Sequence, residues 1–332
     1  MNKLDDFLRS KIDQASINSP SNWEALNQAI PKKTTSGIAK WAFALLLLGG
    51  LGTSVFLLKN NNNIVSSTSS NTPIKSADNN STDLTTNIVD KYSYDKRLKY
   101  FKNETNLGAT NNHNKALQYI TGKYVAMFSD DDIMLQSSLK KRIEVLDNNN
   151  DVVLVHSSLS TIDENNLLIQ KGHWAKDIYN DFKIDTGFMN NGFLKSVLIN
   201  KWNFISMPTV MLKAEVLSQN CLIFNPALKY SIDWDLWLNL SEYGKFYYIN
   251  EELVHYRKHS NNETNRISPD IALSELVLMK LSYYYKYKSN ELNENFIDDV
   301  LRECALQINE AYGLKSLKKH WIKVIFDKYF CN

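Results

Sequence analysis

Three consecutive aspartates, Asp130, Asp131 and Asp132, directly follow a short apolar run at 124–128. The run has the pattern of a strand that is buried on both faces of a parallel sheet. Ligands of such sheets bind beyond the carboxyl ends of the strands, where these aspartates lie. Adjacent carboxylates repel one another unless a cation neutralises them, and hard oxygens suit Mg2+ or Mn2+ with a substrate phosphate. The pattern predicts a metal-assisted phosphate site, and the alternative is an acidic loop that caps the next helix.

The elements around these aspartates alternate between helix and strand. Leu139, Ile143 and Leu146 lie at helical spacing directly after them. Strands that alternate with helices of this length predict βαβ units and an α/β fold with a mostly parallel sheet. The expected elements are a helix at 82–92, a strand at 97–101, a helix at 109–120, the strand at 124–128 and a strand at 152–156.

The second half of the chain is less regular. The segment 174–201 is rich in aromatic residues and Asn and has no clear period, so it receives no assignment. The stretch 232–240 has the pattern of a helix that is apolar nearly all round, with Gly244 predicted as a left-handed residue after it. A strand is expected at 245–250, and a helical C-terminal extension at 266–332.

Composition sets limits on the function. The 332 residues are 43% hydrophobic, which permits a sizeable core and one large or two smaller domains. A formal net charge of +2 gives no indication of a nucleic-acid partner, and none is expected. Cys221, Cys304 and Cys331 are odd in number and widely spaced, so they predict free thiols and not a disulfide framework or a zinc site.

The N-terminal part predicts a membrane anchor. Residues 1–38 have the pattern of short amphipathic helices. No charge occurs at 41–58, which as a helix would rise about 27 Å, so a single transmembrane helix is predicted at 39–59. A buried core segment is the alternative for this run. The stretch 60–77 is rich in Asn, Ser and Thr and predicts a flexible linker.

The predicted span also leads to an expected localisation in a bacterial inner membrane. Lys32, Lys33 and Lys40 precede it, whereas Lys59 and Lys75 follow, so the lysine bias favours a cytoplasmic N-terminus and an extracytoplasmic remainder. A catalytic domain that used cytoplasmic substrates would have to face the other way.

Five motifs follow one another from about residue 78 to 265. They are Asp78-Asn-Asn-Ser-Thr-Asp83, Asn106-Leu-Gly-Ala-Thr-Asn-Asn-His-Asn114, Gly122-Lys-Tyr-Val-Ala-Met-Phe-Ser-Asp-Asp-Asp132, Asp233-Trp-Asp-Leu-Trp237 and Tyr256-Arg-Lys-His259. Together they resemble the inverting family-2 glycosyltransferases of GT-A fold, in the order and approximate spacing of that family. The region before the span faintly resembles bacterial anti-sigma-type membrane regulators.

The resemblance implies a catalytic domain at 78–265 that moves a sugar, with inversion, from a nucleotide-diphosphate donor to a glycan or lipid-linked acceptor. It implies that Asp78 contacts the nucleotide base and that Asp130 faces the sugar-nucleotide. The acidic cluster corresponds to the family's DxD motif. In it Asp131 is the ligand of Mn2+ or Mg2+, with Asp132 and His259 as further candidates. The alternatives are that Asp132 caps the following helix and that His259 is an exposed loop residue.

The resemblance also assigns Asp233 as the general base that removes the proton of the acceptor hydroxyl. Trp234 would desolvate this carboxylate and raise its pKa toward working pH. Without the resemblance, Asp233 is an acidic residue in the first turn of a helix, which the helix dipole favours. Asn106, Gly108 and Asn114 are expected to be turn and cap residues.

One part of the family pattern is missing. Family members open with an apolar strand roughly thirty-five residues before the turn at Asp78, and here the hydrophobic span occupies that place. Either the run at 43–48 is a degenerate first strand, or a foreign N-terminal segment is fused to a truncated transferase. The leading hypothesis is a membrane-anchored glycosyltransferase of cell-envelope polysaccharide, and the second is an inactive transferase-like domain in a single-span regulatory or structural protein. An intact first strand that packs beside 124–128 and leaves a pocket over Asp131 would favour the enzyme, and a free-standing helix at 41–58 would favour the second hypothesis.

Overall fold

The computed structural model describes residues 45–46, 54–58, 74–95, 98–260, 262–287, 300 and 303–304. The chain divides into two compact units. The larger unit covers 36–226 and 233–263, and the smaller includes 227–232 and the chain from residue 264 onward.

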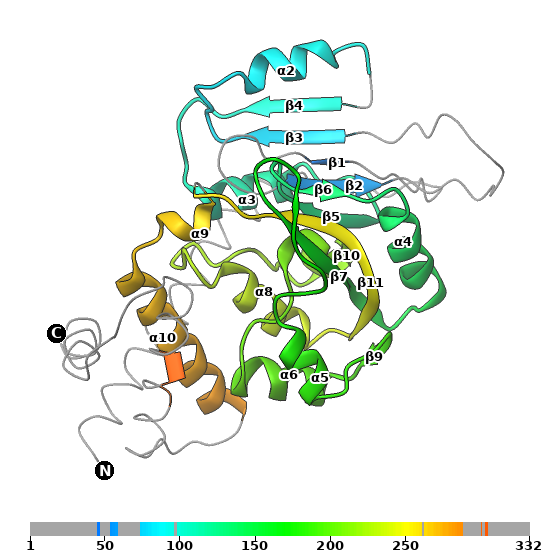
Figure 1. Cartoon of the computed structure of the whole chain (residues 1–332), viewed down its shortest axis with the longest axis vertical. Coiled ribbons are helices and arrows are strands. Elements are labelled where there is room, and N and C mark those ends of the chain that lie inside the picture. Colours follow the sequence, from blue (N-terminus) through cyan, green and yellow to red (C-terminus); the bar gives the residue numbers. More distant parts are fainter. Residues whose placement is uncertain are drawn as a thin grey trace. The chain divides into compact units, whose positions relative to one another are not determined.

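All strands of the described residues belong to one mixed sheet in the larger unit. Its order is β4-β3-β1-β2-β5-β10-β7-β11-β6, with β8 paired to β7 and β9 paired to β11. Figure 1 shows β4, β3, β1 and β2 following one another toward β5. The strands are β1 (Leu45–Leu46), β2 (Ser54–Leu58), β3 (Ile74–Asp78), β4 (Leu98–Lys102), β5 (Tyr124–Phe128), β6 (Ile133–Met134), β7 (Val152–Ile162), β8 (Leu168–Gln170), β9 (Gly187–Met189), β10 (Met211–Lys213) and β11 (Lys245–Arg257).

The helices confirm most of the expected alternation. Those predicted at 82–92, at 109–120, after the aspartates and at 232–240 are present, with shifts of a few residues at their ends. The helices are α2 (Thr85–Lys91), α3 (Ala109–Gln118), α4 (Ser138–Asn148), α5 (Lys176–Asp181), α6 (Asn191–Asn200), the 3-10 turn η1 (Met207–Thr209), α7 (Ala214–Gln219), α8 (Ile232–Leu240), α9 (Glu263–Arg266) and α10 (Pro269–Tyr287).

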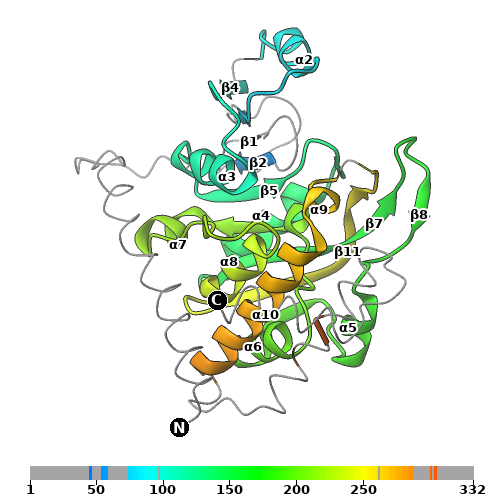
Figure 2. The same cartoon turned by 90° about the vertical axis from the view of Figure 1, so that its left-hand side faces the viewer.

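The strand β5 occupies the predicted residues, and each of them is at most 4% exposed. The sheet around it is not mostly parallel, however. β10 lies between β5 and β7 and runs antiparallel to both. Strand direction was wrongly predicted because β10 is three residues long and buried throughout, so its sequence has no alternation to reveal it. Figure 2 shows β7 and β8 as a hairpin arm beside β11.

The stretch predicted as a transmembrane helix forms strands where the structure describes it. β2 pairs antiparallel with β5 from Ser54 opposite Phe128 to Leu58 opposite Tyr124, and β1 pairs with β2 and β3. Among the described residues, no helix is long and apolar enough to cross a membrane. An uncharged apolar run suits a buried strand as well as a membrane helix, and the glycines at 49, 50 and 52 disfavour the helix. The predicted orientation of the chain in a membrane depends on that helix.

Other predicted boundaries shift or lie outside the described residues. β3 starts at Ile74, inside the predicted linker, and pairs in parallel register with β4. The larger unit also begins before residue 78, since it contains β1 and β2. The predicted helices at 1–38 and the remaining linker at 60–73 lie outside the described residues. Of the C-terminal extension, α10 confirms the helical prediction for its first part.

Position 244 needs a glycine because a side chain would not fit there, and not because the backbone is left-handed. The prediction of a left-handed residue is therefore wrong, since Gly244 is not among the described glycines with a positive φ. A Cβ at this position would lie 2.4 Å from Val153 Cγ1 and 2.7 Å from the carbonyl oxygen of Asp151. The close approach lets the chain enter β11 directly beside the start of β7.

In the smaller unit, Glu275 of α10 anchors the segment that leads into α8. Its carboxylate accepts hydrogen bonds from the backbone N–H groups of Lys229, Tyr230 and Ser231, at 2.7, 2.7 and 3.0 Å. Three backbone donors satisfy a largely buried carboxylate, which would otherwise be costly to bury.

Candidate active site

A short strand brings the aspartates to the end of β11. β6 follows them directly and pairs antiparallel with β11, with Ile133 opposite His255. One residue further along this register, Asp132, which directly precedes β6, corresponds to Tyr256 of β11. The motif at 256–259 therefore meets the acidic cluster although more than 120 residues separate them in sequence.

Asp131 and His259 are in direct contact. His259 Nε2 lies 3.0 Å from Asp131 Oδ2, and both side chains are partly exposed. The amide of Asn262 donates to the same oxygen at 3.2 Å, and its carbonyl oxygen accepts from the His259 N–H at 2.7 Å. The side chain of Asp130, by contrast, is exposed at the strand end.

Asp132 points away from that pair. Its Oδ1 accepts a hydrogen bond of 2.8 Å from the Arg257 N–H, and within the described structure its buried Oδ2 has no hydrogen-bond partner. Burial raises the pKa of this carboxyl well above its ordinary value, and the neighbouring charge of Asp131 raises it further. Asp132 does not cap the following helix, because α4 begins after Ser137 without a side-chain cap.

Arg257 ties the aspartate loop to a second loop. Its Nε donates to the Asp131 carbonyl at 2.7 Å, its Nη1 to the Asp163 carbonyl at 2.8 Å and its Nη2 to Asn166 Oδ1 at 2.7 Å. One planar guanidinium thus holds the backbone of the aspartate cluster and the turn between β7 and β8. Sequence reasoning included Arg257 in a motif but assigned it no role.

Arg257→Lys is expected to loosen this arrangement. Lysine retains the charge but lacks the planar fork that reaches three acceptors at once. We expect the free energy of unfolding to fall by about 2 kcal/mol in denaturant titrations. The exposed Arg266→Lys is the matched control. An unchanged free energy of unfolding in Arg257→Lys would contradict the structural role of these three hydrogen bonds.

Asp78 lies at the end of β3 and is fully buried. Its Oδ1 accepts from the Ser81 N–H at 2.7 Å, and its Oδ2 accepts from the Tyr100 hydroxyl. Asn79 beside it accepts from the Leu107 N–H at 2.7 Å. These bonds shape the turn at 78–81 and attach the segment before α3 to it.

The expected turn and cap residues have two different roles. Asn106 Oδ1 accepts from the Gly108 N–H at 2.8 Å, and Gly108 has a φ of 77° at the start of α3, so both are turn residues as predicted. Asn114 is not a cap. It lies buried within α3, where its amide exchanges hydrogen bonds of 2.8 and 2.9 Å with the backbone of Phe224.

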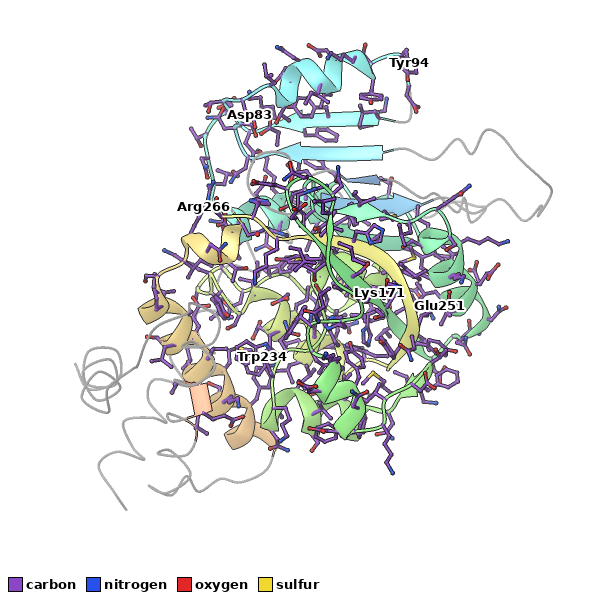
Figure 3. All side chains as sticks on the ribbon, in the orientation of Figure 1. Asp83, Tyr94, Lys171, Trp234, Glu251 and Arg266 are labelled. Carbon is purple, nitrogen blue, oxygen red and sulfur yellow. The ribbon has the colours of Figure 1, made fainter. Side chains whose placement is uncertain are left out.

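Asp233 lies in the first turn of α8, half-buried. Its Oδ1 accepts from the Trp234 N–H at 2.8 Å, and its Oδ2 accepts from Asn203 Nδ2 at 2.9 Å. Burial raises its pKa to about 6, and these two hydrogen bonds oppose the rise. The direction agrees with the prediction. Trp234, labelled in Figure 3, is itself only 2% exposed within the packed body of the protein.

The pKa of Tyr256 responds to carboxylates from two motifs. Burial raises the pKa of its hydroxyl, and the charges of Asp132, Asp131 and Asp233 raise it further. All three carboxylates therefore act electrostatically on one phenol.

The raised pKa of Asp233 predicts a pH-dependent gain in stability on its removal. A carboxyl with a pKa of about 6 in the folded state and about 3.9 unfolded binds its proton more tightly when folded. Its ionisation therefore costs stability as pH rises from about 4 to about 6, and the full cost persists above that. Relative to the unchanged protein, Asp233→Asn should gain about 2 kcal/mol of unfolding free energy between pH 4 and pH 7.5. The exposed Asp177→Asn is the control and should show no such gain. If the unfolding free energy of Asp233→Asn differs from that of the unchanged protein by the same amount at pH 4 and at pH 7.5, the pKa of Asp233 is not raised.

Sequence reasoning missed Asn203, Asn262 and Arg257. Asn203 follows a segment without period, and Asn262 lies beyond the last motif, so no local pattern indicated either. Within the described residues, no group of three or more His, Cys, Asp or Glu side chains is arranged to hold a metal ion by itself.

Residues 56–210 match the family described as Glycosyl transferase family 2. An uncharacterized glycosyltransferase of Haemophilus influenzae is 29% identical over 285 residues, covering 78% of this chain and 84% of that protein. Another, of Methanocaldococcus jannaschii, is 32% identical over 209 residues, covering 62% of this chain and 64% of that protein.

Among solved structures, S. aureus TarS 1-349 in complex with UDP-GlcNAc superposes with a TM-score of 0.52 at 18% identity. The likeness covers 78% of this chain and 73% of that one, and it concerns the fold. Residues 56–210 are therefore similar to glycosyltransferase family 2, and the chain has an α/β fold of GT-A type.

Proposed function

We propose that the chain transfers a sugar, with inversion, from a nucleotide-diphosphate donor to a glycan or lipid-linked acceptor, with the help of Mn2+ or Mg2+. The observation that carries this proposal is the contact between Asp131 and His259. It joins two of the five motifs, whose residues are 128 apart in sequence, and Asp233 lies in a third motif. On the donor side, Asp78 would lie toward the nucleobase of the donor and Asp130 toward the sugar-nucleotide.

The residues present fit a divalent cation. Asp131 offers a carboxylate oxygen and His259 an imidazole nitrogen on the same side of the loop. Mg2+ and Mn2+ at phosphate sites commonly take one or two protein ligands and complete their shell with substrate oxygens and water, so a larger protein cage is not needed. The bound cation would neutralise charge on the departing diphosphate. Asp132, which bonds to the Arg257 backbone, supports the loop in this proposal.

Asp233 is the proposed base. The acceptor oxygen forms a bond to the anomeric carbon, the bond from that carbon to the diphosphate oxygen breaks, and its electron pair leaves with the diphosphate. The hydroxyl proton passes to Asp233. A pKa of about 6 leaves this carboxylate mostly ionised at pH 7 and still basic enough to accept the proton.

The strands before Asp78 favour the enzyme over an inactive single-span protein. The enzyme hypothesis expects a first strand beside β5, and β2 pairs with β5 over five residues. β1 pairs with β2 and with β3, the strand that ends at Asp78. β1 and β2 thus lie in the sheet between β3 and β5.

A calorimetric titration of the full chain tests this function. UDP is the first nucleotide to use, since TarS is solved with UDP-GlcNAc, and other nucleoside diphosphates follow. We expect binding that requires Mn2+ or Mg2+ and is lost when EDTA is added. Equal affinity with and without the cation, or no binding of any nucleoside diphosphate, would contradict the proposal.

A further inference from the structure

The proposed base is held from two directions. One hydrogen bond to the Asp233 carboxylate comes from its own helix, through the Trp234 N–H. The other comes from Asn203, thirty residues earlier in the chain, whose Nδ2 lies 2.9 Å from Asp233 Oδ2. A carboxylate has about four acceptor positions. These two bonds occupy one position on each oxygen.

The orientation of the Asn203 amide follows from its second hydrogen bond. The Ile205 N–H donates to Asn203 Oδ1 at 3.2 Å. The oxygen side of the amide therefore faces its own loop, and the NH2 side faces Asp233. The reversed amide would place an oxygen against the carboxylate and an NH2 group against a backbone donor, and both contacts are repulsive.

The loop that carries Asn203 is fixed in the core. Phe204 and Ile205 are fully buried. The Tyr179 hydroxyl donates to the Phe204 carbonyl at 3.0 Å, and Trp237 Nε1 donates to the Ile205 carbonyl at 3.3 Å. Trp237 belongs to the same helix as Asp233, so the loop and the helix are attached to each other at Ile205 as well as at Asn203.

We propose that Asn203 is a positioning residue for the transfer reaction, which holds the Asp233 carboxylate in one orientation and favours its ionised form. This role rests on the proposed function, since it matters only if Asp233 accepts a proton. The remaining acceptor positions of Asp233 are then presented in a fixed direction to the acceptor hydroxyl. Positioning of this kind lowers the cost of reaching the reactive geometry.

The electrostatics of the site agree. Burial raises the pKa of Asp233 to about 6, and the bond from Asn203 acts in the opposite direction. A hydrogen bond to the ionised form of a carboxyl stabilises that form. Without this donor the pKa would rise further, and a larger share of the base would be protonated at neutral pH.

Two substitutions test the role. Asn203→Ala removes the donor, whereas Asn203→Asp still accepts the Ile205 N–H but presents a carboxylate to Asp233 where the amide donated. The pKa of Asp233 is measured by 13C NMR of its carboxyl carbon. The resonance is assigned because it is missing from the spectrum of Asp233→Asn. The measured pKa is then compared with the pH dependence of kcat. Asn200→Ala, whose exposed amide donates to Ser196, is the control.

In Asn203→Ala, the pKa of Asp233 measured by NMR is expected to rise by about 1 unit, and the acidic limb of the pH profile of kcat should shift upward by the same amount. Both shifts should be larger in Asn203→Asp. The Kd of the donor should stay within about twofold, because a base acts only in the transition state. An unchanged titration of Asp233 in an active protein would overturn the role of Asn203 alone. A shifted titration in a protein that transfers no sugar would overturn the proposed function and, with it, the role in transfer.

Discussion

Replacing Asp233 by Asn is expected to lower kcat by about 10^3-fold, within the range that a general base contributes. The acceptor hydroxyl must lose its proton as its oxygen attacks, and Asn cannot accept that proton. The side chain keeps its size, and the N–H of Trp234 can still donate to an amide oxygen. The Kd of the donor should therefore remain within about twofold, which separates a loss of chemistry from a loss of binding.

The control for this variant lies on the same helix. Asp235→Asn removes an equal charge two residues away, where the carboxylate bonds to Asn239. It is expected to keep most of its activity. Equal losses of donor affinity and kcat in Asp233→Asn would show that Asp233 positions the donor instead of acting as base.

Asp131→Asn is expected to lower the affinity for a nucleoside diphosphate in the presence of Mn2+ by about 100-fold. The substitution removes a charged ligand from a partly exposed strand end, so core packing is unaffected and the protein should still fold. Isothermal titration with and without Mn2+ measures the effect. The residual, metal-independent affinity of the variant should equal that of the unchanged protein in EDTA.

The exposed Asp177 on α5 provides the comparison, because Asp177→Asn removes the same charge far from the aspartates in sequence. Its Mn2+-dependent affinity should be unchanged. If Asp131→Asn also binds the nucleotide with undiminished Mn2+ dependence, Asp131 is not a ligand of the cation.

Much of the fold was predictable because local patterns are strong in the first half of the domain. β5 is an uninterrupted apolar run between polar ends, and α3 and α4 follow helical spacing closely. Asp131, His259 and Asp233 are predicted as site residues from the sequence, since each lies in a motif that resembles the family's. What their motifs could not show is the pairing of β6 with β11, which places the first two in contact.

The errors have a common physical origin. An apolar run is compatible with a membrane helix, a buried helix or a buried strand, and only its partners decide. For 54–58 the partner is β5, and for Met211–Lys213 it is β5 and β7 together. Asn203 was missed for a related reason. Its role comes from Asp233 on a distant helix and not from any neighbour in sequence.

The most direct test of the central claim is the stereochemistry of transfer. The purified full chain is incubated with Mn2+, a panel of nucleotide-diphosphate sugars and candidate acceptors, and the anomeric configuration of the product is determined by NMR. A single displacement assisted by one base predicts a product whose anomeric configuration is opposite to that of the donor, formed only when Asp233 is intact. A product with retained configuration, or transfer that Asp233→Asn leaves unchanged, would contradict the mechanism proposed for this site.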